Sequence, residues 1–273
     1  MPGLGRYIGR GFATVLTSPW LIAMTLVVPL ALWVLVVLAG FRGPVSPLGH
    51  VLSPPPLSTL TFDSIVANAV GGGSGFTAIL TIVVTVVLRA VIHAAFAGLV
   101  VDQLQGGASS HLSIVRGIQA LPATIAVSLG GFVSLNVGSV LGAVAGGGLA
   151  LFAQIAVLVL GVYLLAFAPF VALTEPSGPR AALSKAVRAT RMPGAGNLTF
   201  AAIYTFVAVV VYLTPKSGSL LGVNPSLSAW LVILATSFLH VAALAALGYR
   251  YLSVADDIPE AAPRTEPVRP GRR

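Results

Sequence analysis

The chain has 273 residues, of which 56% are hydrophobic and only 8% are charged, and its mean hydropathy is +0.97. Soluble domains carry about 25% charged residues. These figures exclude a soluble enzyme, an intrinsically disordered chain and a coiled coil, and they predict a polytopic membrane protein. The chain has no cysteine, which also excludes disulfides, thiolate nucleophiles and cysteine-based metal sites.

A helix needs about 20 apolar residues to cross the hydrocarbon core of a bilayer. Six segments fit this length, although the fifth is short, so we predict an all-α bundle of six transmembrane helices with short cytosolic interfacial helices. We divide the chain into an amphipathic juxtamembrane segment (1–18), the bundle (19–252) and a disordered cytosolic tail (253–273). The predicted spans are Pro19–Phe41, Phe76–Val101, Leu121–Ala145, Leu149–Leu173, Leu198–Leu213 and Leu227–Tyr251.

The segment before the first span has the periodicity of an amphipathic helix. One reading is a helix that lies in the headgroup plane, and the other is a basic anchor that sets the topology. Its apolar side consists of Leu4, Ile8, Phe12 and Val15, and its opposite side of Arg6, Arg10, Thr14 and Thr17.

The distribution of Lys and Arg predicts the orientation in the membrane. If the N-terminus is inside, twelve of the 15 basic residues lie inside and only Arg42 and Lys216 lie outside, while Arg89 falls within a span. This asymmetry follows the positive-inside rule and predicts that both termini are cytosolic. It also explains the net charge of +8 without nucleic acid, because the basic residues flank apolar segments and suit anionic lipid. In the longest outside loop, Leu57–Val70 is a candidate interfacial helix.

The two inside loops resemble each other. Each has an acidic residue after a span, a small-residue turn, a short helix that carries an arginine, and then a proline. Asp102 and Arg116 belong to the first loop, and Glu175 and Arg188 to the second. This pattern suggests two parallel structural repeats, although two loops can also match by chance.

The second loop carries a family resemblance. The residues concerned are Ala168-Pro169-Phe170-Val171, Glu175, Gly178 and the run from Ala181 to Arg191. They resemble a signature of bacterial six-helix membrane proteins, which include the membrane domain attached to some glycerophosphodiester phosphodiesterases and relatives of unknown function. The order of helices is similar over residues 1–252, but Met192-Pro193 departs from the motif. The resemblance implies a bacterial inner-membrane protein. Since the chain contains no phosphodiesterase domain, we do not expect that activity.

Two polar residues of the second span, Arg89 and His93, share one helix face. A charge at this depth costs at least ~2.5–3.5 kcal/mol on insertion scales, so Arg89 should face the bundle or water. One interpretation is a site for an anion or a lipid phosphate, in which Arg89 supplies the donors. The other is that Arg89 snorkels to the cytosolic interface.

The sequence offers no convergent catalytic or metal-binding set. The histidines fall on different elements, and all seven carboxylates lie outside the predicted spans. Buried acids are common in metal-dependent lipid transferases and proton-coupled carriers. We therefore predict no enzymatic activity, no metal and no cofactor.

The leading hypothesis is a non-enzymatic multi-pass membrane protein that organises lipid or a partner protein at the cytosolic face. Its lipid-binding candidates are Arg180, Lys185, Arg188 and Arg191, with Arg89 and His93 inside the bundle. A partner membrane protein or a second copy of the chain also remains a candidate. The alternative is a transport component, either a small permease or a subunit of an exporter. It requires a cavity lined by Arg89, His93, Gln154 and Asn136.

Overall fold

The computed structural model describes residues 3–38, 75–107, 109–145, 147–175, 178–191, 196–213 and 225–258. All regular secondary structure in these residues is helical, which confirms the predicted all-α class. The elements are α1 (Leu4–Thr17), α2 (Pro19–Leu38), α5 (Gly75–Leu104), α6 (His111–Gln119), α7 (Leu121–Ala145), α8 (Gly147–Leu165), α9 (Ala168–Thr174), α10 (Pro179–Thr190), α11 (Asn197–Leu213), α12 (Pro225–Leu252) and the 3-10 helix η2 (Ala255–Asp257).

Five of the six predicted apolar segments coincide with single helices to within three residues at each end. The exception is the predicted span Leu149–Leu173, which is divided into α8 and α9. Pro169 is the second residue of α9. A proline has no N–H to donate, and inside a helix its ring collides with the carbonyl four residues earlier. That carbonyl belongs to Leu165, where α8 ends.

Two pairs of consecutive helices are sharply bent. α1 and α2 meet at 85° around Ser18, and α6 and α7 meet at 68° around Ala120. The Ser18 hydroxyl donates to Ser109 at 3.2 Å and accepts from the Leu21 N–H at 3.3 Å. Ser18 therefore caps α2 and links the first bend to the turn between α5 and α6.

Two stretches are long and apolar enough to cross a membrane: Val86–Leu104 in α5 and Ile155–Thr174 across α8 and α9. Each bent pair adds one more if it is counted as a single span, so the described residues contain two to four candidate spans. This agrees with a membrane protein. The predicted number of six spans is not established by these criteria and stays a prediction.

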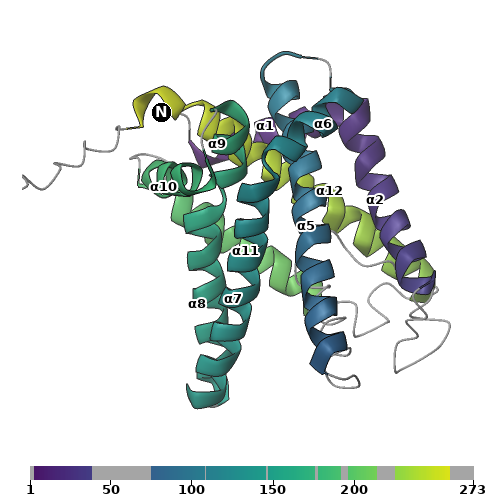
Figure 1. Ribbon diagram of the computed structural model, residues 1–273, viewed down its shortest axis with the longest axis vertical. Helices are drawn as coiled ribbons and strands as arrows, with labels where there is room; N and C mark the ends of the chain where they lie inside the picture. Colours follow the sequence, from purple (N-terminus) through teal and green to yellow (C-terminus); the bar gives the residue numbers. More distant parts are fainter. Residues whose placement is uncertain are drawn as a thin grey trace, which may run out of the picture.

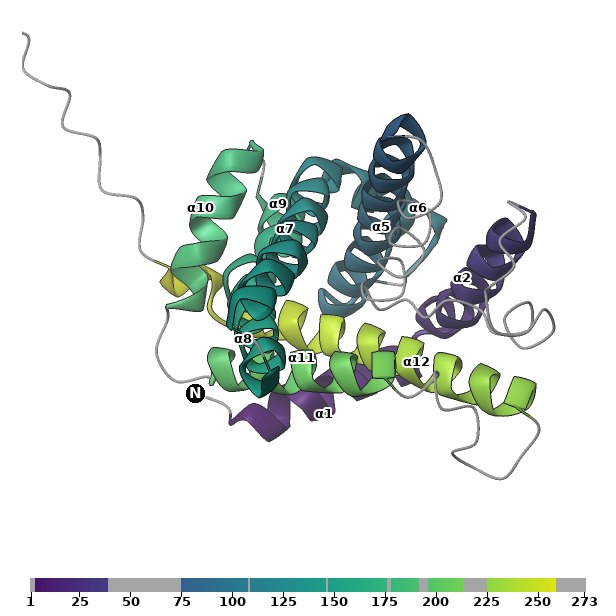
Figure 2. The ribbon, with the colours of Figure 1, turned by 90° about the horizontal axis from the view of Figure 1, so that it is seen from below.

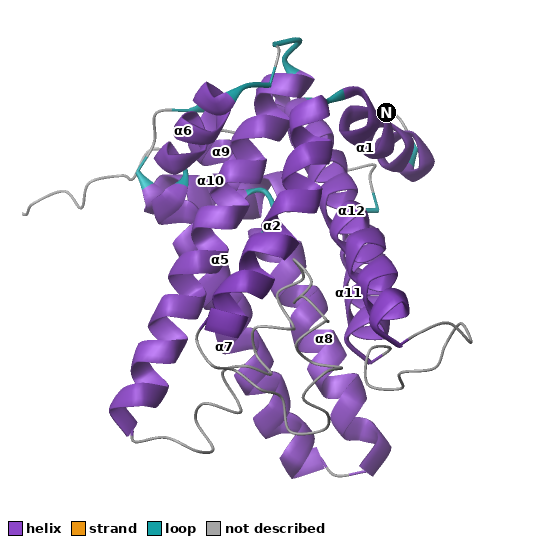
Figure 3. Ribbon diagram, turned by 90° about the vertical axis from the view of Figure 1, so that its right-hand side faces the viewer, coloured by secondary structure: helices purple, strands orange, loops and turns teal. Residues whose placement is uncertain are grey.

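The long helices are arranged side by side, with the short ones gathered at one end. α5, α7 and α8 run together, and α2 flanks α5 (Figure 1). α1, α11 and α12 lie alongside one another when the molecule is seen from below (Figure 2). The short helices α6, α9 and α10, together with α1, lie at the end that is uppermost in Figures 1 and 3. We call this end the short-helix end.

α1 packs lengthwise on the second half of α12 instead of standing apart at the surface. Its buried residues are Tyr7, Gly11, Thr14 and Val15. A Cβ on Gly11 would collide with the carbonyl oxygen of Ala242 and lie 2.9 Å from the Ala246 Cβ, so glycine allows the two backbones to touch. The predicted amphipathic helix is present, but its buried face is rotated from the expected one. Thr14, expected on the polar side, is buried, and Leu4, Ile8 and Phe12 are only partly buried.

Large apolar side chains are exposed on the outer faces of most of the long helices. Val144 is 83% exposed, Phe152 72% and Phe206 63%. Water would oppose exposure on this scale, whereas lipid chains would cover such side chains at no hydrophobic cost. The outer surface therefore fits a bilayer better than an aqueous medium.

Some sequence predictions fall outside the described residues. They include the Leu57–Val70 helix and the tail beyond residue 258. The packed part of the chain extends past the predicted boundary at residue 252, because Val254 and Ile258 are buried on either side of η2.

Candidate functional site

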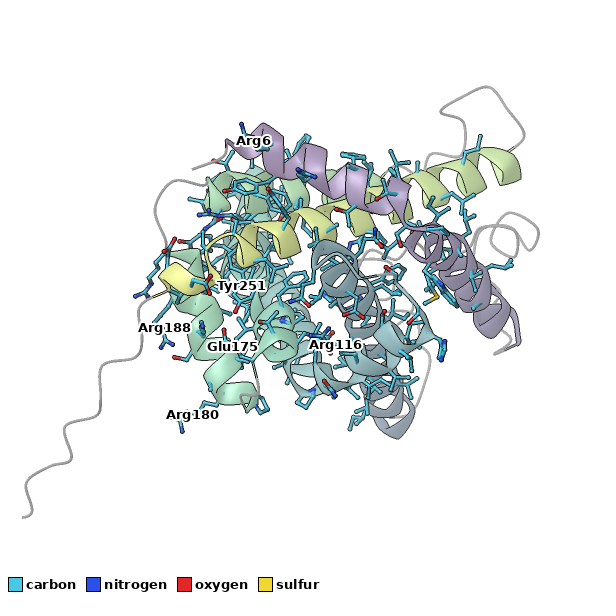
Figure 4. The ribbon with its side chains drawn as sticks, turned by 90° about the horizontal axis from the view of Figure 1, so that it is seen from above. Arg6, Arg116, Glu175, Arg180, Arg188 and Tyr251 are labelled. Atoms are coloured by element: carbon cyan, nitrogen blue, oxygen red, sulfur yellow. The ribbon has the colours of Figure 1, made fainter. Side chains whose placement is uncertain are left out.

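α10 presents a basic face outward and an alanine face inward. Ala182, Ala186 and Ala189 are fully buried, and α10 packs against α9 and α8 with this face. Arg180 and Arg191 are exposed. The Arg180 and Arg188 side chains extend away from the neighbouring helices (Figure 4). This is the orientation expected from the helical periodicity, because small side chains permit close packing and arginines favour water or headgroups.

Lys185 is engaged in an ion pair, so it differs from the three arginines of α10. Its Nζ donates to Glu175 Oε1 at 2.5 Å, and the Tyr251 hydroxyl donates to the same oxygen at 2.9 Å. Glu175 directly follows α9 and Tyr251 lies near the end of α12. This carboxylate thus ties three helices together. The similarity of the two loops drew attention to Arg188, whereas the structure pairs Glu175 with Lys185.

The first loop contains the corresponding contact. Arg116 on α6 donates to Asp102, in the last turn of α5, at 2.5 Å. Ser110 begins α6 with a capping box. The Ser110 hydroxyl accepts from the backbone N–H of Ser113, and the Ser113 hydroxyl accepts from the backbone N–H of Ser110. Both short helices are therefore fastened by an acid–base pair to the helix that precedes them, through Arg116 in α6 and Lys185 in α10.

The outward face of α6 is apolar. Leu112, Val115 and Ile118 are 64%, 57% and 54% exposed, while Ser113 and Gly117 are buried. The carbonyl of Ser113 lies where a Cβ of Gly98 would be, so α6 crosses α5 in backbone contact. The usual amphipathic pattern is thereby reversed: small residues face the protein and large apolar ones face outward.

A chain of hydrogen bonds joins α1, α12, α11, α10 and α8. Buried Arg250 donates to the Tyr7 hydroxyl at 3.0 Å and to Asn197 Oδ1 at 3.4 Å. Asn197 Nδ2 and the Tyr163 hydroxyl both donate to the Thr190 carbonyl, at 3.1 and 3.0 Å. This network holds the C-terminal end of α10. Sequence reasoning missed it, since Arg250 counted there only as one of the inside basic residues.

A second polar cluster lies within the helices. Arg89 is only 7% exposed and lies 15 residues before the end of α5, about 22 Å along the helix axis. The His93 ring faces the His240 ring edge-on, with centroids 6.5 Å apart. His240 Nδ1 shares a 2.5 Å hydrogen bond with the Tyr204 hydroxyl, in which the tautomer of His240 sets the donor. The cluster therefore spans α5, α12 and α11.

The structure describes the side chains of only three of the four residues that the transport alternative requires. Asn136 is exposed on α7, and the Gln154 side chain lies outside the described part of the structure. His240 and Tyr204 instead join His93. His240 alone in the last span is weak evidence for such a cluster, because nothing in the sequence places it opposite α5.

Among the described residues, no group of three or more His, Asp or Glu side chains converges as a metal site would require. No protein-family model, curated protein or solved structure matches this chain.

Proposed function

We propose that this chain is a non-enzymatic, multi-pass integral membrane protein whose cytosolic face binds anionic lipid headgroups through α10. The observation that carries the proposal is the outward basic face of a helix that is fixed by its alanines. Arg180 and Arg191 are exposed, and Arg188 is partly exposed. Lys185 takes no part in lipid binding in this proposal, because Glu175 holds it.

α6 supports the proposal from the same end of the molecule. The apolar stripe formed by Leu112, Val115 and Ile118 is suited to the acyl-chain boundary just below the headgroups. Apolar side chains entering the lipid on α6 and arginines reaching headgroups on α10 together match the two layers of a bilayer leaflet. The proposal also includes six spans, both termini in the cytosol, a bacterial inner membrane, and kinship with the membrane domain of the glycerophosphodiester phosphodiesterases.

The test compares two variants with equal loss of charge. Arg180, Arg188 and Arg191 are changed to Gln in the first, and Arg264, Arg269 and Arg272 of the tail in the second, so that each lowers the formal charge of +8 by three. Each arginine near an anionic surface contributes about 1 kcal/mol. The α10 variant should therefore bind anionic nanodiscs more weakly, on the order of 100-fold, and retain fewer anionic lipids in native mass spectrometry.

The tail variant should retain most of the affinity. Equal losses in the two variants would mean that net charge alone attracts the lipid, and unchanged lipid retention in the α10 variant would refute the proposal. Copurification of one stoichiometric protein partner that α10 binds would replace lipid with a protein as the ligand of this face.

A transport component is the second candidate, and the polar cluster between α5, α11 and α12 is the observation that favours it. Ionisable residues within transmembrane helices commonly mark the path of a substrate or an ion. Uptake of a solute by proteoliposomes containing the wild-type chain, lost on changing His93 or His240, would support this function.

A further inference from the structure

The polar cluster has a defined register that brings further side chains to the level of Arg89. His93 of α5 faces His240 of α12. Seven and eight residues further on, Val100 Cγ1 lies 3.0 Å from the position of a Cβ on Gly248. The two helices thus run in the same direction with nearly equal spacing. One turn before the two histidines, Arg89 on α5 is level with Ser237 on α12.

Two polar atoms of this cluster, Ser237 Oγ and His93 Nε2, are buried and lack a hydrogen-bond partner in the described residues. Ser237 is fully buried, and its Oγ has no hydrogen-bond partner there. The same holds for His93 Nε2, while Nδ1 of His240 is occupied by Tyr204. A buried hydroxyl without a partner destabilises the folded state. Such atoms in a native structure call for a ligand, an ion or a water.

The chemistry of the cluster selects an anion. Arg89 is permanently positive and offers only donors, in a planar fork that matches an oxyanion. The Ser237 hydroxyl can donate, and each imidazole can donate from a protonated ring nitrogen. The four carboxylates of the described residues lie elsewhere, at the end of α5, after α9 and in η2. A cation would meet repulsion from Arg89 here, whereas an oxyanion would receive two or more charge-assisted hydrogen bonds.

We infer that Arg89, His93 and Ser237, with His240 and Tyr204 behind them, form a buried binding site for a phosphate group between α5, α12 and α11. The group can belong to free inorganic phosphate or to a phospholipid. This site is separate from the outward face of α10, and it does not depend on the function proposed for that face.

The test uses the full chain in neutral detergent, with sodium phosphate as the probe and sodium chloride at matched ionic strength as the reference. A ligand that binds only the folded state raises the melting temperature in a saturable manner. We expect such a rise for the wild type. In Arg89→Gln the phosphate affinity should fall by about tenfold or more.

Ser237→Ala distinguishes a loss of phosphate binding from a loss of folding. It removes a buried hydroxyl that has no partner, so the protein without phosphate should be as stable as the wild type or more so, and yet its response to phosphate should be weaker. Thr205→Val is the matched control. Thr205 is likewise buried, with 3% of its surface exposed, and its hydroxyl has no partner among the described residues. It points in another direction from the site, because its side chain is about 100° around α11 from that of Tyr204. It should respond to phosphate as the wild type does.

Native mass spectrometry of the same proteins separates the two sources of phosphate. A phospholipid that is retained by the wild type and lost in Ser237→Ala and Arg89→Gln, without a response to free phosphate, assigns the site to lipid. A response to free phosphate alone assigns it to the inorganic anion. The inference is overturned if neither readout differs between the wild type and these two variants, since the cluster would then hold only water.

Discussion

Arg250 and Tyr7 lie 243 residues apart in the sequence, and the Arg250 guanidinium donates to the Tyr7 hydroxyl at 3.0 Å in a buried contact. The guanidinium carbon also lies 5.3 Å from the centre of the Tyr7 ring. α1 and α12 are thus joined by both a hydrogen bond and a cation–π contact.

Tyr7→Phe should destabilise the protein while keeping the ring contact. The variant removes the acceptor from a buried charged donor, which costs about 1 to 3 kcal/mol. Tyr249→Phe is the control, because Tyr249 offers its ring to Arg10 at 5.8 Å and to Tyr7 at 5.9 Å. Denaturant unfolding in micelles should show the larger loss for Tyr7→Phe. Equal losses would mean that the Arg250 hydrogen bond contributes little.

Two glycines of α1 should respond to alanine with opposite signs. At Gly9 an added methyl group meets nothing within 4 Å, so Gly9→Ala should stabilise by about 0.5–1 kcal/mol through helix propensity. At Gly11 it meets the Ala242 backbone, and overpacking there should cost about 1–3 kcal/mol. Thermal unfolding measures both changes. A stabilising Gly11→Ala would show that α1 does not pack on α12 as described.

The packing of α10 against its neighbouring helices can be tested independently of its charges. Ala186 is fully buried and Ala181 is exposed on the same helix. Ala186→Leu should destabilise by about 1–3 kcal/mol, because the added side chain forces α10 away from its neighbours. Ala181→Leu should change the stability by less than about 0.5 kcal/mol. The comparison requires only melting curves of the two variants, and similar curves would contradict the orientation of α10.

The helices themselves could be predicted from the sequence because apolar length and helical periodicity are local properties. Leu121–Ala145 was predicted to the residue, and the arginine and alanine faces of α10 follow from its spacing alone. Pro169 divides the predicted span Leu149–Leu173, whereas Pro29 stays inside α2.

The partners of these faces could not be predicted, because periodicity gives the direction of a side chain on its own helix and not the helix that lies opposite. Nothing local places His240 beside His93, or Arg250 beside Tyr7. For the same reason the similarity of the two loops singled out Arg188, whereas Glu175 pairs with Lys185 in the structure. Among the described residues, two to four candidate spans meet the length rule, because short and bent helices satisfy it only in part.

The contact between α1 and α12 also constrains the order in which the molecule can assemble. Gly11 is made 231 residues before the Ala242 backbone against which it packs. Ribosomes add about 5–20 residues per second, so α1 waits roughly 10 to 50 s for its partner. Throughout this interval its inner face must be covered by lipid or by the insertion machinery. The first helix to be synthesised is therefore among the last to reach its final position.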